Sequence, residues 1–182
     1  MKTLTGFLIG AVAALCACGE SEDGGKIEVA TATATFAGMN GQNVVGTAKF
    51  TRDPRGEVTL AVTLTAAPAG THGIHIHEVP SCGNQGMDAG PHWDDLDTGP
   101  ANHHLPPRDS GGDRAGHLGD LGNIEVATDG TGSLAFSNPA WTLGDGAATD
   151  VVPHAIILHQ MVDDGTMPSA GARWGCALIA AD

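Results

Sequence analysis

The chain has 182 residues, of which 8 are basic and 21 are acidic, and its formal net charge at neutral pH is −13. This length fits one domain that can bury a core of its own. The excess of acidic residues argues against nucleic acid as a partner, because the two would repel each other.

The N-terminal stretch predicts an export signal. Residues 1–17 contain one lysine, an apolar run from Leu4 to Leu15 and small residues before a cysteine. The apolar run is too short to span a membrane. The residues around Cys18 resemble a bacterial lipoprotein processing site, at which Cys18 would be lipidated; an ordinary secretory signal is the alternative. We therefore expect the protein in the periplasm or cell envelope, touching the membrane only through this lipid.

Residues 18–25 are short, polar and contain glycine, which suits a tether, and the folded body is expected over residues 26–182. Loss of residues 1–17 would remove Lys2 and no acid. That leaves 7 basic against 21 acidic residues and a net charge of −14.

Alternating apolar and polar residues predict strands through most of this body. The clearest case is EVTLAVTLT at residues 57–65, where every second side chain is apolar. Similar segments, separated by Gly, Asp, Asn and Pro, occupy residues 27–36, 44–51, 124–127, 133–136, 155–159 and 173–179. Because no segment shows the pattern of an amphipathic helix, the sequence predicts an all-β antiparallel sandwich or barrel.

Residues 79–122 interrupt this pattern with a long stretch rich in Gly, Pro, Asp and His. Segments of this length without periodicity are usually functional loops or disordered. This one carries groups that a disulfide or a metal can hold, namely Cys82, His92, His103, His104, His117 and Asp120. We therefore expect an ordered binding loop.

The cysteines suggest one disulfide. Of the four, Cys16 would leave with the signal and Cys18 would carry the lipid, so Cys82 and Cys176 remain as a pair in an oxidising compartment. A bond between them would close a loop of about 94 residues. In the chain-entropy model this stabilises the fold by about 4 to 5 kcal/mol.

Residues 73–78 read GIHIHE, with His75 and His77 in alternate positions. Positions i and i+2 of a strand share a face, so the two imidazoles would project together while the isoleucines enter the core. Taken alone, such a pair is more typical of surface histidines on a solvated face.

The other histidines change this interpretation. Seven of the nine lie between His72 and His117, and an eighth, His159, ends the apolar run of residues 155–158. Clustered imidazoles suit copper and zinc, whereas calcium and magnesium would require oxygen ligands. Asp120, three residues after His117 in GHLGDLGN, can add a carboxylate to a tetrahedral zinc site.

Several stretches together resemble the copper,zinc superoxide dismutases of the bacterial exported kind. In the family's order they are HGIHIHE (72–78), Cys82, AGPHW (89–93), GHLGDLGN (116–123), HAIILHQMVDD (154–164) and GARWGC (171–176). The resemblance implies a Greek-key antiparallel sandwich or barrel of about eight strands with long metal-binding loops. It also implies copper and zinc as cofactors, disproportionation of superoxide as the reaction, and a homodimer as one expected assembly.

Carried over residue by residue, the resemblance implies that copper is bound by His75, His77, His92 and His159. Zinc would take His92, His117, Asp120 and one further histidine. His92 would therefore bridge the two metals.

The further zinc ligand departs from the family pattern, because NHHLPP places His103 and His104 later after the bridging histidine than the family does. We expect His104, which lies three residues before Pro107 as in the family motif. His103, three residues before Pro106, is the alternative.

The resemblance also assigns roles around the metals. Arg173 matches the arginine that docks superoxide beside copper, and His92 would take up and donate a proton. Asp163 matches a carboxylate that orients one copper and one zinc histidine. His72 matches a position that braces the backbone near the copper strand.

Two other functions stay open at this point. One is a periplasmic protein of the same fold that buffers or delivers copper or zinc. The other is a structural lipoprotein without metal, which fails to explain why so many imidazoles gather in one loop. Arg173 favours the enzyme, because storage needs no docking arginine. The thirteen residues between His159 and Arg173 contain no Lys or Arg, so we expect slow capture of superoxide with little dependence on salt.

Overall fold

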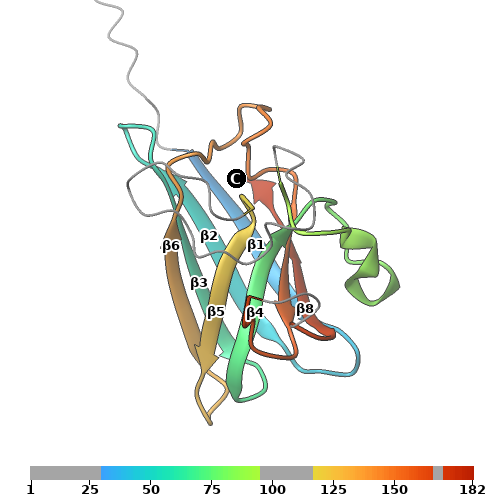
Figure 1. The fold of residues 1–182 in the computed structure, drawn as a ribbon. Helices are drawn as coiled ribbons and strands as arrows, with labels where there is room; N and C mark the ends of the chain where they lie inside the picture. Colours follow the sequence, from blue (N-terminus) through green and yellow to red (C-terminus); the bar gives the residue numbers. More distant parts are fainter. Residues whose placement is uncertain (1–29, 95–116, 166–169) are drawn as a thin grey trace, which may run out of the picture.

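The structure is a computed structural model that describes residues 30–94, 117–165 and 170–182 (Figure 1). Its strands are β1 (Ala30–Gly38), β2 (Val45–Arg52), β3 (Val58–Ala66), β4 (Gly70–His77), β5 (Asp120–Val126), β6 (Gly132–Ser137), β7 (Ala155–His159), β8 (Arg173–Leu178) and β9 (Ala180–Ala181). Cys18, His103 and His104 lie outside the described residues, as do the predicted signal and tether.

The strands form an antiparallel barrel in the order β1–β2–β3–β6–β5–β4–β7–β8. β8 pairs again with β1, which closes the barrel, and β9 continues beside β1. The connections from β3 to β4 and from β6 to β7 join strands that are not neighbours, as in a Greek key. The predicted all-β Greek-key fold is confirmed.

Period-two alternation explains β1, β2 and β3. In β3 the apolar residues Val58, Leu60, Val62 and Leu64 are buried, and the residues between them are exposed. Each strand thus contributes one apolar face to the barrel interior and one polar face to solvent. The ends of these strands lie within three residues of the predicted ones, except that residues 27–29 are outside the described part.

The end of β4 and the whole of β7 are buried on both faces. His75 and His77 are 0% and 1% exposed, as deeply buried as their neighbours Ile74 and Ile76. All five residues of β7 are buried as well. The interpretation of the histidine pair as surface residues is therefore wrong, because the chain around His92 pairs with this end of β4 and covers it.

Strand β5 begins four residues before the predicted segment at 124–127. Its first residue, Asp120, pairs with His75 of β4, and the ladder shifts register between Gly73 and His75. Apolar alternation could not indicate this part of the strand, because Asp120 faces the histidine cluster, Leu121 packs in the core, and the next two residues are only partly buried.

The loop after β4 is anchored to β8. Its described part contains a short 3-10 helix, η1 (Asn84–Ala89), and a disulfide joins Cys82 to Cys176 of β8. The predicted disulfide is confirmed. Among the described residues, no helix is long and apolar enough to cross a membrane.

Candidate metal centre

Four histidines from three parts of the barrel come together in one buried group. His75 and His77 lie on β4, His159 is the last residue of β7, and His92 pairs with His77 through an isolated bridge. One ring nitrogen of each lies within 4.8 Å of the others. These are the four residues that the sequence predicted as copper ligands.

Three of these rings are oriented by an oxygen on their outer side. The His75 Nε2 atom lies 2.7 Å from an oxygen of Asp163, and the His77 Nδ1 atom lies 2.9 Å from the carbonyl oxygen of Gly90. His159 Nδ1 faces the carbonyl oxygen of Gly171 at 3.5 Å. Because these oxygens only accept, each outer nitrogen carries the hydrogen and donates it. The inner nitrogen then presents a lone pair to the group, as a metal ligand must.

The charge state of the rings also suits a metal. Burial lowers the pKa of His75 to about 4 and that of His159 to about 3. Burial also lowers the pKa of His77 well below its usual value, and nearby His92 and Arg173 act in the same direction. At neutral pH all three imidazoles are therefore neutral, which is the form that binds metals.

A second group shares His92 with the first. It contains His92, His117 and Asp120, and their ligand atoms also lie within 4.8 Å of one another. His92 Nδ1 donates to an Asp120 oxygen at 2.7 Å, and the other Asp120 oxygen accepts from the His117 backbone N–H at 2.9 Å. Burial raises the pKa of Asp120, but the hydrogen bond and charge of His92 outweigh it and the pKa is lowered. The carboxylate is thus ionised and buried.

These donor sets fit the two implied metals. Four imidazoles suit copper, and two imidazoles with one carboxylate leave room for a fourth ligand in a tetrahedral zinc site. The predicted fourth zinc ligand, His104 or its alternative His103, lies outside the described residues. His92 is the residue common to both groups, as the sequence predicted.

Backbone hydrogen bonds tie the three ligand-bearing segments together. Trp93 N–H donates to the Ile76 carbonyl at 2.9 Å, Ile76 N–H donates to the Gly119 carbonyl at 2.8 Å, and Gly119 N–H donates to the Trp93 carbonyl at 2.9 Å. Each member of this triangle is next to a ligand in the sequence: Ile76 to His75 and His77, Trp93 to His92, and Gly119 to Asp120. The ligands are therefore placed by main-chain bonds as well as by their own rings.

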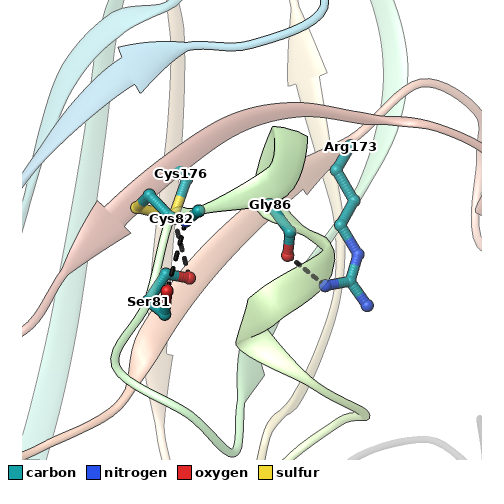
Figure 2. Close-up of a disulfide and its surroundings, with 6 residues drawn as sticks. Ser81, Cys82, Gly86, Arg173 and Cys176 are labelled. Carbon is teal, nitrogen blue, oxygen red and sulfur yellow. Dashed lines mark hydrogen bonds between the residues drawn. A yellow bond between two sulfur atoms is a disulfide. The ribbon is translucent and has the colours of Figure 1, made fainter.

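Arg173 lies beside the first group at the start of β8. Its guanidinium donates to the carbonyl oxygen of Gly86 and, at 2.6 Å, to that of Gly90. Figure 2 shows the side chain reaching from β8 toward Gly86 in the loop that the disulfide anchors. The Gly90 oxygen also accepts from His77, so one carbonyl links the arginine to a predicted copper ligand. Burial lowers the pKa of Arg173, which stays far above neutrality.

The remaining predicted residues lie near this centre. Asp163 is bonded to His75, one of the two histidines it was expected to orient. His72 is 3% exposed, and its ring nitrogens lie within 2.9 Å of the carbonyl oxygens of Gln160 and Pro68, next to the end of β7. This placement agrees with a brace near the copper strand.

Sequence reasoning missed several groups that hold the centre. Asp94 has an oxygen 3.7 Å from His117 Nε2. The Asn123 side-chain amide forms two hydrogen bonds with the backbone of Asp163. It donates to the Asp163 carbonyl at 2.9 Å and accepts from the Asp163 N–H at 2.7 Å. Asn123 closes the GHLGDLGN stretch, so its position gave a signal. The carbonyls of Gly86, Gly90 and Gly171 gave none, because every residue has a carbonyl.

The fold and the two ligand groups together define a β-barrel protein with two groups of residues that could each hold a metal ion. A family model for copper/zinc superoxide dismutase matches residues 44–179. The chain therefore belongs to the copper/zinc superoxide dismutase family.

Solved structures agree with this fold. The clock protein EA4 is 23% identical, with a TM-score of 0.67 over 82% of this chain and 93% of that chain. A superoxide dismutase-like protein from Bacillus subtilis is 25% identical, with a TM-score of 0.65 over 81% of this chain and 97% of that chain. The likeness to EA4 supports the fold alone.

Proposed function

We propose that the protein disproportionates superoxide. Two superoxide anions and two protons give one molecule of oxygen and one of hydrogen peroxide. Copper would supply the one-electron redox change, and zinc, which has no redox chemistry, would hold the shared histidine in place. The observation that carries this proposal is the half-buried Arg173 joined through the Gly90 carbonyl to His77, beside four clustered imidazoles.

The chain's own residues have distinct tasks in this reaction. His75, His77, His92 and His159 would hold copper, and His92, His117 and Asp120 would hold zinc together with His104 or His103. Arg173 would attract and orient the superoxide anion. His92 Nε2, the ring nitrogen on the side of the first group, would take up a proton and donate it to the peroxide product.

The test is a superoxide-decay measurement on the copper- and zinc-loaded protein and its Arg173→Ile variant. We expect the variant to keep its metals and lose about tenfold or more in rate, because the docking charge is gone. Arg55→Ile is the matched control, since Arg55 is an exposed arginine paired with Asp53. If the loaded wild-type protein decays superoxide no faster than Arg173→Ile, the proposal is wrong and metal buffering or delivery takes its place.

We also propose that the protein works in the cell envelope, held by a lipid on Cys18. The Cys82–Cys176 disulfide supports an oxidising compartment. In cells, Cys18→Ala should move the protein from the membrane fraction to the soluble fraction. An unchanged membrane fraction would contradict lipidation at this residue.

A further inference from the structure

A histidine outside both ligand groups packs against the segment that bears the shared ligand. The His154 ring stacks on the Trp93 indole, with ring centroids 4.2 Å apart and an interplanar angle of 29°. Its Nδ1 atom lies 2.9 Å from the Glu78 carbonyl oxygen and donates to it. Trp93 is only 3% exposed, whereas His154 is partly exposed.

The two residues that the His154 ring contacts each directly follow a predicted ligand in the sequence. Trp93 follows His92, and Glu78 follows His77. His154 itself precedes β7, the strand that ends in His159. One ring therefore touches the chain next to two predicted ligands, and it directly precedes the strand that supplies a third.

The segment around His92 belongs to no named strand and is held by individual contacts, among them the bond of the Glu78 N–H to the Pro91 carbonyl and the packing of Trp93 in the core. It pairs with β4 through the isolated His77–His92 bridge and through the Trp93 bonds to Ile76 and Gly119. In an extended segment, adjacent side chains point to opposite sides. Fixing the Trp93 indole on one side therefore limits how far the His92 imidazole can rotate on the other.

We propose that the stack of His154 on Trp93 is a positioning device that sets the orientation of His92, the histidine shared by the two ligand groups. The proposal rests on these groups binding copper and zinc, but not on turnover of superoxide. Because His92 belongs to both groups, loosening it weakens both metals together. A partner that orients a single ligand would weaken one metal more than the other.

The test compares three substitutions of His154. His154→Ala removes both the stack and the hydrogen bond, His154→Phe keeps only the stack, and His154→Asn keeps only a donor for the Glu78 carbonyl. Each protein is loaded with zinc and copper(II), the release of zinc to a chelator is timed, and the copper(II) electron paramagnetic resonance spectrum is recorded.

We expect His154→Ala and His154→Asn to release zinc about tenfold faster and to change the copper(II) spectrum, at the low end of the effect of partners that orient metal ligands. His154→Phe should stay within about twofold of the wild type and keep its spectrum. Leu134→Ala is the control for general destabilisation, because Leu134 packs partly buried against the core from β6. It should lower the melting temperature without changing the copper(II) spectrum.

Three outcomes would overturn the proposal: no change in His154→Ala, rescue by Asn rather than by Phe, or a spectral change in Leu134→Ala as large as that in His154→Ala. Failure of the proposed dismutase activity is distinguishable from these. In that case the wild type would bind both metals and decay no superoxide, and the order of the His154 variants in zinc release would still hold.

Discussion

Asp163 decides which nitrogen of His75 faces the ligand group. Its side chain is 6% exposed, and its oxygen lies 2.7 Å from His75 Nε2, so that the Nδ1 atom is turned inward. Asn123 holds the Asp163 backbone from both sides, and the Gly165 N–H bonds the second carboxylate oxygen at 3.0 Å. The carboxylate is thus fixed before any metal binds, and it fixes the ring in turn.

Replacing Asp163 with Asn should weaken copper binding about tenfold, because a neutral amide oxygen is a poorer acceptor for the His75 N–H than a carboxylate. A competition titration with a copper chelator measures this affinity. Asp129→Asn is the matched control, since it removes the same charge from an exposed turn where Asp129 bonds Thr131. Equal copper affinities in wild type and Asp163→Asn would rule out the orienting role.

At the scale of single residues, the sequence indicated the predicted ligands better than the groups that orient them. His75 and His77 stood out by their alternate spacing, and His92, His117, Asp120 and His159 by motifs that resemble one family. Gly90 did not stand out, although its carbonyl accepts from both His77 and Arg173. A role played by a backbone oxygen depends on the fold and leaves no mark in residue type. His154 was given no function for a similar reason: its partner, Trp93, is 61 positions away in the sequence and adjacent only in space.

Among the elements, β4 contributes most to the geometry of the site. It pairs with β5 along one edge and with β7 along the other, so His75 and His77 lie between Asp120 and His159. The segments around Gly119 and Trp93 form hydrogen bonds directly with the backbone of Ile76. A β-carbon added at Gly119 would lie 2.1 Å from the Ile76 carbonyl oxygen, so this close approach requires glycine.

Gly119→Ala should therefore destabilise the fold severely, by about 3 kcal/mol or more, because backbone rather than a flexible side chain must move. Denaturant unfolding of the metal-free protein measures the loss. Gly122→Ala is the comparison: nothing lies within 4 Å of its added β-carbon, and only its positive φ of 85° is strained. That cost should be about 1 kcal/mol. If the two variants were equally stable, the close approach at Gly119 would not be a constraint.

The strands could be predicted from the sequence where one of their faces is exposed to solvent. β3 showed its alternation in the sequence because solvent meets every second residue, and β7 was found as an apolar run. The start of β5 was missed, because Asp120 at the site and Leu121 in the core are both buried and break the alternation. The part of the loop with His103 and His104 lies outside the described residues, so the choice between them stays a prediction.

On the scale of the whole molecule, the charge of the protein works against its proposed substrate. The chain has a net charge of −13, so the protein and superoxide are both anionic. Residues 160–172, which lead from His159 to Arg173, contain two aspartates and no Lys or Arg. Long-range attraction is therefore absent from this part of the chain, and Arg173 acts only at short range because it is half-buried and held by two carbonyls.

The rate of superoxide decay should consequently change less than about twofold between 0.01 M and 0.15 M salt, while the Debye length shortens from about 30 Å to about 8 Å. Over this range, added salt would lower the rate where surface cations attract superoxide, and it would raise the rate where the net negative charge repels superoxide. Gln160→Lys, an exposed position directly after His159, provides the comparison. Its rate should exceed that of the wild type at low salt and approach it as salt is added. A steep fall in the wild-type rate with salt would show that steering charges elsewhere on the protein guide superoxide to Arg173.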